Sequence, residues 1–300
     1  MQNKILAFGA DGLVGSRFTD LYHKETQFIT PKVTELDITD KSALVEFFAK
    51  NSSDFDSVIN FAAITDVDGA EKERGNEEGL TWKVNVGGVE NIAELCKKHS
   101  KYLIQISTDF VFPGNKQRPG PYSENETPPG SPDGIGWYGW TKRVAEERAA
   151  KIWDKTAILR ITFPYRAHYP TKIDFARKIL ELFDEGKLYP MFSDQNMTPS
   201  FIDEIAKVLY LLVEEKETGV FHSASKDLTT IYEFASYLLE KARGAKGVVK
   251  KGSMQEFLKA PGRTPRSRLG GLKVEKTEGE LDIKFMTWRA AVEELVSQLG

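Results

Sequence analysis

A tyrosine and a lysine, Tyr138 and Lys142, stand four residues apart in the segment 137–142. Residues at this spacing lie on one face of a helix, so their side chains can share a site. A free phenol titrates near pH ~10, but a neighbouring ammonium favours the phenolate and lowers the pKa of the tyrosine. The pair could therefore exchange a proton with a substrate. Both residue types are common on helices, so the pattern indicates catalysis only if the rest of the chain supplies a site around it.

A glycine-rich turn lies near the start of the chain. The apolar run 4–8 predicts a buried parallel strand, and Gly9, Gly12 and Gly15 follow it before a helix that we expect to end near residue 24. Glycines at such a turn let the backbone approach a pyrophosphate, which the helix N-terminus stabilises. A turn directly between strand and helix is what the dinucleotide-binding fingerprint requires. We predict a cofactor site at Gly9, Asp11, Gly12, Leu13, Val14 and Gly15.

The second expected strand, 27–30, bears on which dinucleotide is bound. Its end carries no Asp or Glu to hold the adenosine 2′-hydroxyl of NAD. Arg17 and Lys32 could instead meet a 2′-phosphate, which favours NADPH, with NADH as the alternative. Asp37, followed by Ile38, could accept a hydrogen bond from the adenine amino group. The third strand, 57–61, leads to further cofactor-binding candidates, which are Phe61, Ala62, Ala63 and Thr65.

Hydroxyl side chains follow a fourth expected strand, 102–106. They include Thr108, at the carboxyl edge where open α/β sheets bind their ligands. A fifth strand, 156–161, comes after the helix that carries Tyr138. Strand and helix alternate from the first residues, so we predict an α/β fold with a Rossmann-type doubly wound parallel sheet.

The second half of the chain is predicted to form a smaller, interleaved substrate-binding domain. We assign 1–162 and about 198–242 to an NAD(P)-binding domain, and 163–197 and 243–300 to the substrate-binding domain. The segment 241–276 carries eleven Lys and Arg against two Glu, which indicates a local anionic ligand. The loop 112–137 is longer than a plain connection needs and is typical of a functional lid.

Composition bounds the class of protein. A net charge of −3 gives no case for binding nucleic acid or an anionic membrane. Cys96 is the single cysteine, so no intrachain disulfide can form, and the four histidines lack ligand spacing for a metal. The apolar run at the start is too short for a signal peptide or a membrane span. We therefore expect a cytoplasmic protein without a metal, a nucleic-acid partner or a membrane partner.

Together these motifs resemble the extended short-chain dehydrogenase/reductase family, and within it the dTDP-4-dehydrorhamnose reductases. The likeness spans nearly the whole chain, with the motifs in the same order as in the family. They are Gly9…Gly12…Gly15, 36–40, 60–63, 107–112, Tyr138-Gly139-x-Thr141-Lys142, Leu159-Arg160, Asp194-Gln195 with Thr198-Pro199, Arg263-x-x-x-Ser267-x-Leu269 and Thr287-Trp288-Arg289-x-Ala291.

The resemblance implies hydride transfer from NAD(P)H to the C4 keto carbon of a nucleotide-activated 6-deoxy sugar, with dTDP-4-dehydrorhamnose, reduced to dTDP-rhamnose, as the first candidate. Tyr138 would donate the proton to the carbonyl oxygen and Thr108 would hydrogen-bond that oxygen. Lys142 would lower the pKa of Tyr138 and bind the nicotinamide ribose, while the cofactor supplies the redox chemistry. The implied substrate-binding residues are Thr108, Asp109, Phe163, Gln195, Thr198 and Arg263, with Arg266 as the rival of Arg263 for phosphate.

The chain departs from this pattern at two positions. Phe163 stands where these reductases usually carry a tryptophan, which leaves the identity of the sugar open. Arg17 stands where some members place a glutamate of a metal-linked dimer, so we expect a monomer or a weak homodimer.

Two other functions remain open. One is an NAD-dependent sugar-nucleotide epimerase or dehydratase, although dehydratases often carry acidic residues after the Ser/Thr and here Phe110 follows Asp109. The other is a non-catalytic NADP-binding regulatory subunit, like the beta subunit of methionine adenosyltransferase, which the intact Thr108, Tyr138 and Lys142 set disfavours.

Overall fold

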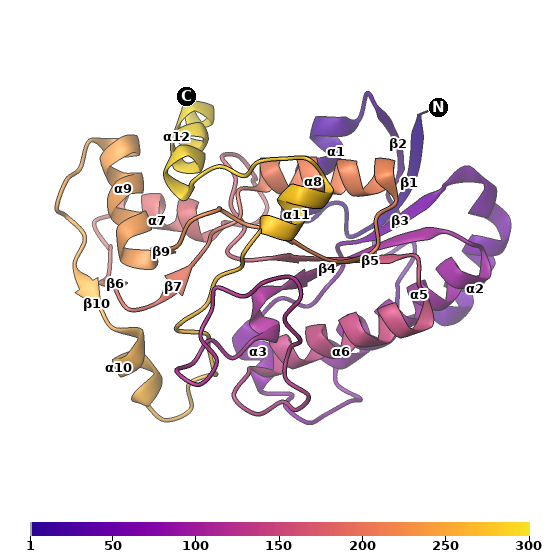
Figure 1. The fold of residues 1–300 in the computed structure, drawn as a ribbon, viewed down its shortest axis with the longest axis horizontal. Coiled ribbons are helices and arrows are strands. Elements are labelled where there is room, and N and C mark those ends of the chain that lie inside the picture. The colour runs from indigo at the N-terminus through magenta and orange to yellow at the C-terminus, as the bar shows by residue number, and fades with distance from the viewer. Residues whose placement is uncertain (1) are drawn as a thin grey trace.

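A six-stranded, all-parallel sheet forms the centre of the computed structural model, which describes residues 2–300 (Figure 1). Its strands are β1 (Asn3–Phe8), β2 (Thr26–Ile29), β3 (Ser57–Asn60), β4 (Tyr102–Thr108), β5 (Thr156–Ile161) and β8 (Gly219–Ser223). They lie in the order β2-β1-β3-β4-β5-β8, so the chain builds outward from β1 to β2 and then returns to β3 on the other side. Ligands of open α/β sheets bind where the order reverses in this way. The predicted doubly wound α/β fold is confirmed.

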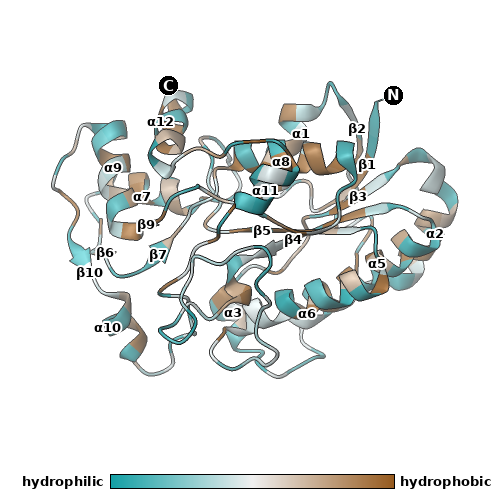
Figure 2. Cartoon of the chain, viewed as in Figure 1, coloured by the Kyte–Doolittle hydropathy of each residue, from teal (hydrophilic) through white to brown (hydrophobic). Residues whose placement is uncertain are grey.

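Helices cover both faces of the sheet. One face packs against α1 (Leu13–Tyr22), α8 (Ile202–Glu215) and α11 (Glu275–Glu280), and the other against α2 (Lys41–Asn51), α5 (Val89–Lys98) and α6 (Trp137–Ile152). Side chains of β4 alternate between the two cores, with Ile104 on the α8 side and Leu103 on the α5 side. Figure 2 shows the apolar residues concentrated on the central strands and hydrophilic residues on the outer turns of α6.

Local sequence explains where several helices begin. Asp40 caps α2 by accepting a hydrogen bond from the Ala43 N–H, as predicted. Thr230 forms a capping box with Glu233 at the start of α9 (Ile231–Arg243), and Thr287 caps α12 (Trp288–Leu299). Asp203 lies in the first turn of α8 but does not cap it, because its carboxylate pairs with a side chain on α1.

The helical stretch between β3 and β4 is divided into three parts. These are α4 (Leu80–Trp82), the π-helical segment η2 (Lys83–Gly88) and α5. Asn85 of η2 is fully buried, and its side-chain amide joins two other parts of the chain. It exchanges two hydrogen bonds with the backbone of Ile64, of 2.8 and 3.0 Å, and donates a third, of 3.1 Å, to the Thr141 hydroxyl on α6. Such π-helical segments are frequent at functional sites.

A second hydrophobic core lies beyond the carboxyl edge of the sheet. It joins α7 (Phe175–Asp184), α9 and α12, and two small sheets and a short helix lie beside it. The first pairs β6 (Met191–Phe192) with β10 (Lys251–Gly252), the second pairs β7 (Asn196–Met197) with β9 (Thr229–Thr230), and the helix is α10 (Met254–Lys259). The expected boundaries place α9 with the Rossmann domain, yet it packs here, whereas Leu272 and Phe285 of the C-terminal segment pack on the parallel sheet.

The long loop predicted to be a lid is anchored in its middle part. Tyr122 is buried and stacks on Phe112, with ring centroids 4.0 Å apart. Glu124 is also buried and accepts hydrogen bonds of 3.1 and 3.0 Å from the backbone and hydroxyl of Thr277. The loop is therefore fixed against the C-terminal segment. The remaining short helical elements are η1 (Ser52–Asp54), α3 (Val67–Glu71) and η3 (Asp109–Val111). Within residues 2–300, no helix combines the length and apolar character that crossing a bilayer requires.

The half-buried Glu204 of α8 makes the stability of the fold depend on pH. Its carboxyl accepts a 2.7 Å hydrogen bond from the Met286 N–H, and burial raises its pKa to about 7 from the ordinary 4.5. A raised carboxyl pKa means that the folded state prefers the protonated form, so stability falls as pH rises from about 4.5 through about 7.

We therefore expect Glu204→Gln to raise the melting temperature relative to wild type at pH 8, with a difference that shrinks as pH falls towards 4.5. Glu215→Gln, at an exposed position of the same helix, is the matched control. Thermal unfolding from pH 4.5 to 8 measures both. A difference that does not change with pH for Glu204→Gln would contradict this expectation.

Candidate active site

A cavity of about 500 Å³ lies at the carboxyl edge of the sheet, above β1, β3 and β4. Its wall is formed by the glycine-rich turn after β1, the ends of β3 and β4, the start of α6, and the segment 163–175. Thr108, Asp109, Tyr138 and Lys142 all line it. The structure thus brings the predicted catalytic residues into one cavity with the turn predicted to bind a dinucleotide.

The first turns of α6 fix the tyrosine and the lysine. Tyr138 is half-buried, and its ring meets that of Phe110 edge to face at 5.9 Å. Lys142 is only 3 % exposed, and its ammonium donates a 2.7 Å hydrogen bond to the Ile106 carbonyl at the end of β4. Gly139 lies against η3 so closely that a Cβ there would be 2.1 Å from the Phe110 carbonyl oxygen. Only glycine permits this contact between α6 and η3.

Burial dominates the electrostatics of these groups. It raises the pKa of Tyr138 well above its ordinary value, the negative charge of Asp109 adds to this, and a hydrogen bond with Thr108 opposes it. Lys142 is not among the causes of this shift, and its ammonium is directed to the Ile106 carbonyl, so the lowering of the Tyr138 pKa by Lys142 stays a prediction. Burial also lowers the pKa of Lys142 to about 8, against the charge of Glu146, and raises that of Asp109 to about 6.

The glycine-rich turn has the conformation that close approach requires. Gly9 has φ +69°, and a Cβ on it would lie 2.7 Å from the Ala62 backbone nitrogen. Gly12 precedes α1, so the first N–H groups of that helix have no acceptor within it. Leu13 and Val14 of this first turn line the cavity. The turn and the helix end together form an anion-binding site of the kind that holds a pyrophosphate.

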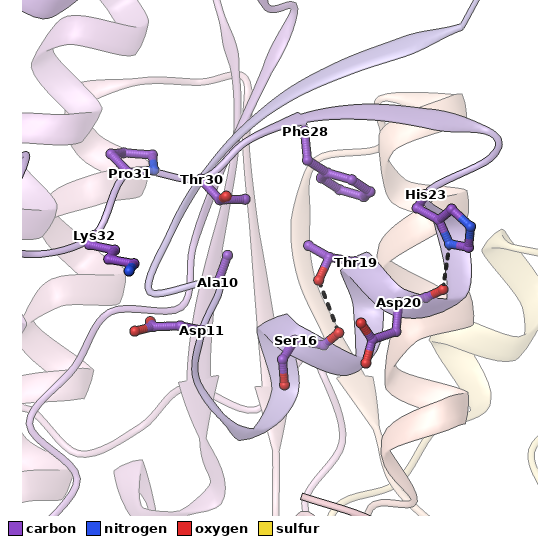
Figure 3. Close-up of a pocket in the computed structure, with 10 residues that line it drawn as sticks. All are labelled: Ala10, Asp11, Ser16, Thr19, Asp20, His23, Phe28, Thr30, Pro31 and Lys32. Carbon is purple, nitrogen blue, oxygen red and sulfur yellow. Dashed lines mark hydrogen bonds between the residues drawn. The ribbon is translucent and has the colours of Figure 1, made fainter. Parts of the chain in front are cut away.

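A second cavity, of about 540 Å³, lies between α1 and the edge strand β2 (Figure 3). Asp11 and Lys32 lie at one end of it, and Asp20 and His23 at the other. Lys32 comes directly after Thr30 and Pro31 at the carboxyl end of β2, where the adenosine ribose of a dinucleotide lies in Rossmann folds. The cation therefore stands where a 2′-phosphate would be met.

The family model for the RmlD substrate binding domain matches residues 3–300 of the chain. The chain belongs to this family. The predicted resemblance is therefore confirmed, and with it the class of oxidoreductase.

Two named relatives and one solved structure show the extent of the likeness. The chain is 32% identical over 286 residues to a probable low-salt glycan biosynthesis reductase, Agl14, of Haloferax volcanii, covering 91% of this chain and 90% of that protein. It is 27% identical to the dTDP-4-dehydrorhamnose reductase of Mycobacterium tuberculosis, with coverages of 96% and 91%. The dTDP-4-dehydrorhamnose reductase of Bacillus anthracis, solved in complex with NADP, superposes with a TM-score of 0.87 at 24% identity over 99% of this chain and 100% of that one, which shows a shared fold.

Several other predicted cofactor residues of this RmlD-family chain also reach the catalytic cavity. Phe61, Ala63 and Thr65 line it, and Ala62 forms the backbone contact with Gly9. Ser107, which was not predicted as a site residue, lines it as well, and its buried hydroxyl has no partner within the described chain.

Three residues predicted to bind the cofactor lie elsewhere. Arg17 is bound to Asp203 by two hydrogen bonds of 2.6 Å, which join α1 to α8, and it lines neither of these cavities. Asp37 accepts hydrogen bonds of 2.8 Å from the backbone and hydroxyl of Thr39. Ile38 is buried beneath Gly88. The Asp37–Thr39 contact is a local turn, whereas the partners of Arg17 and Ile38 lie far away in the chain, where spacing does not indicate them.

The predicted substrate residues divide in a similar way. Phe163 and Gln195 line a third cavity, of about 460 Å³, which shares Phe110, Phe163 and Phe175 with the catalytic one. Thr198 is instead buried, and its hydroxyl accepts a 2.8 Å hydrogen bond from the Leu272 N–H.

The two rival arginines lie at different places. Arg263 is exposed, with its guanidinium over the Phe257 ring at 4.1 Å, and it does not line the third cavity. Arg266 does line it and pairs with Asp68 through contacts of 2.8 Å. The position of the third cavity favours Arg266 as the residue nearer to the reaction.

The tryptophans on either side of Tyr138 are packing residues. Trp137 is buried and stacks on Trp82 at 5.6 Å, and Trp140 lies beneath the guanidinium of Arg143 at 5.7 Å. Neither lines the catalytic cavity.

Asn85 and Gly139 position the site and were not predicted to do so. Asn85 ties the loop after β3 to the helix of Tyr138, and no local pattern marks it. Gly139 lies inside the Tyr138–Lys142 segment, so the sequence could have marked it as a site residue. The need for glycine at this position comes from its contact with η3, which only the structure shows.

The contact at Gly139 should not tolerate a side chain. We expect Gly139→Ala to destabilise the fold by about 1–3 kcal/mol, because the Cβ must displace the Phe110 backbone. Gly279→Ala, at a helical position with no atom within 4 Å, should change stability by less than about 1 kcal/mol. Urea denaturation of the two variants measures this, and equal effects would contradict the packing argument.

Proposed function

We propose that the protein reduces the C4 keto group of a nucleotide-activated 6-deoxy-4-keto sugar with NADPH, and that dTDP-4-dehydrorhamnose is the first substrate to test. The observation that carries the proposal is the meeting of Thr108, Tyr138 and Lys142 in one cavity with the glycine-rich turn. The names of its relatives as reductases support the reaction class.

The cavity residues fit a dinucleotide. Gly9 leaves room where a Cβ would collide with the end of β3, the start of α1 offers free N–H groups, and Ser107 has a buried hydroxyl without a partner. The cofactor would supply the hydride. Lys32 supports NADPH over NADH, as does the NADP bound to the relative from Bacillus anthracis.

Tyr138 would give its proton to the carbonyl oxygen as the carbon is reduced. A phenol is protonated at neutral pH, and the upward shift of its pKa makes Tyr138 a weaker acid, so proton donation depends on stabilising the phenolate that is left. The hydroxyl of Thr108 would hydrogen-bond the same oxygen. The ammonium of Lys142, one turn from Tyr138, would stabilise the phenolate that is left and hold the ribose of the cofactor.

The sugar would lie beside Asp109 and Phe163, where the catalytic and third cavities share residues. The nucleotide would then extend into the third cavity, past Gln195 and Arg266. In this binding mode the cofactor would lie on the parallel sheet and the nucleotide of the substrate against the second core. We propose that these two parts act as the cofactor-binding and substrate-binding domains. Arg263 and Thr198 would shape the loops that carry these contacts.

The test is NADPH oxidation with a panel of 4-keto sugar nucleotides. We expect turnover that consumes NADPH in step with product, and a fall of about 10²–10⁴-fold in kcat for Tyr138→Phe. Tyr210→Phe, on α8 and outside the cavity, is the control. The proposal fails if no keto sugar supports oxidation, or if Tyr138→Phe matches wild type. Conversion of a sugar nucleotide without net NADPH consumption would favour an epimerase or dehydratase.

Lys32 gives a separate prediction about the cofactor. Loss of one charge-assisted contact to phosphate should raise the KM for NADPH about 10-fold in Lys32→Ala and leave the KM for NADH unchanged. Lys24→Ala, an exposed lysine beyond the end of α1, should change neither. Initial rates with the two cofactors decide this, and an equal effect on both would argue against a role at the 2′-phosphate.

A further inference from the structure

A buried ion pair lies directly behind the catalytic lysine. Glu146 follows Lys142 by one turn of α6, and it accepts hydrogen bonds of 2.9 and 2.7 Å from the guanidinium of Arg160 on β5. The side chains are 8 % and 2 % exposed, and no other ion pair within residues 2–300 has both partners below a tenth.

This pair is not explained by stability. Taking two charges out of water costs several kcal/mol, and apolar residues of similar size often stabilise a fold equally well or better. Its position next to Lys142 suggests another role, since residues four apart on a helix are neighbours.

The far side of the pair is held by a neutral histidine. An Nη atom of Arg160 lies 3.5 Å from Nε2 of His222, and Nδ1 of His222 lies 2.8 Å from the Lys273 carbonyl. Burial and the charge of Arg160 lower the pKa of His222 to about 3, so the ring is neutral. Because a carbonyl can only accept, Nδ1 carries the proton and Nε2 is the acceptor facing Arg160. The guanidinium is thereby fixed between His222 and Glu146.

We propose that Glu146 is a positioning residue that keeps Lys142 charged and in place, with Arg160 and His222 holding the carboxylate where it does so. The proposal rests on the proposed function in that Lys142 serves the reduction. It assigns a role to a residue that lies outside the cavity and touches neither substrate nor cofactor.

The buried surroundings of Lys142 make its pKa sensitive to the charge of Glu146. Burial disfavours the ammonium and brings its pKa to about 8, and the charge of Glu146 is what opposes this. On the cavity side the lysine shares its space with Tyr138 and Asp109. Charged groups on the helical segments packed against α6 already have partners. Glu71 of α3 accepts a hydrogen bond from the Trp137 N–H of α6 and pairs with Arg74, and Asp68 of α3 pairs with Arg266. Glu90 of α5 pairs with Arg148 of α6, and Lys83 of η2 pairs with Glu78. Removing the charge of Glu146 would therefore lower the pKa of Lys142 further.

The charge of Lys142 can be measured without any activity. NMR titration of the full-length protein labelled with 13C at lysine Cε follows each amine, and Lys142→Arg assigns the resonance. We expect Glu146→Gln to lower the titration midpoint of Lys142 by about 1 pH unit, as loss of a nearby opposite charge does. Arg160→Met should not lower it, because the carboxylate remains. Both variants break the same buried pair, so a structural disturbance would shift both alike.

The same variants separate the roles in catalysis. We expect the basic limb of the pH profile of kcat/KM to move to lower pH in Glu146→Gln and to stay in place in Arg160→Met. If the single variants fold poorly, the double variant Glu146→Gln/Arg160→Met removes the pair without leaving an unpaired charge, and its Lys142 midpoint should also lie below wild type. An unchanged midpoint in Glu146→Gln, or equal shifts in both single variants, overturns the proposal. If the protein reduces no keto sugar, the proposed function is overturned. The titration midpoints of Lys142 in the variants would still decide the role of Glu146.

Discussion

The contact between Gly139 and the carbonyl of Phe110 is the constraint on which the site depends. It lets α6 lie against η3 more closely than any side chain would allow, and it therefore sets how near Tyr138 comes to Thr108. Asn85 supports the same arrangement from the other side, because its amide holds the loop after β3 to Thr141. The segments that carry the catalytic groups are thus held together by contacts of neighbouring residues as well as by contacts of the catalytic groups themselves.

Burial decides how these groups ionise. A lysine one turn from a tyrosine would be expected to lower the pKa of the phenol, but in this cavity desolvation and the carboxyl of Asp109 raise it. The same desolvation lowers the pKa of Lys142 to about 8. Both shifts disfavour charge in the cavity, so in the proposed reaction the phenolate left by Tyr138 would depend on the ammonium of Lys142 for its stabilisation. The carboxylate of Glu146, which is paired with Arg160, is the charge that opposes this lowering.

The second core provides the other half of the site. Its cavity is walled mainly by aromatic and aliphatic side chains, and it joins the catalytic cavity at Phe110, Phe163 and Phe175. The pair between Arg266 and Asp68 connects the basic C-terminal segment to α3 beside this junction. A ligand lying across both cavities would contact both cores, which explains why the chain crosses between them more than once.

The sequence by itself determined the parallel α/β fold, the glycine-rich turn and the family, because each depends on residues close together in the chain or on motifs in a fixed order. The pattern of short apolar runs was enough to find the first five strands of the main sheet. Only the tertiary structure decided which polar residues reach the cavities. Arg17 was expected at a phosphate, but it is paired with Asp203, 186 residues away, and the Thr198 hydroxyl is bound to the backbone of Leu272. The sequence also did not show that α9 belongs to the second core. An amphipathic helix could pack on the parallel sheet or on other helices, and its partners α7 and α12 are brought to it only by the fold. Pairing between distant residues and the desolvation that shifts a pKa arise from packing, which local spacing does not encode.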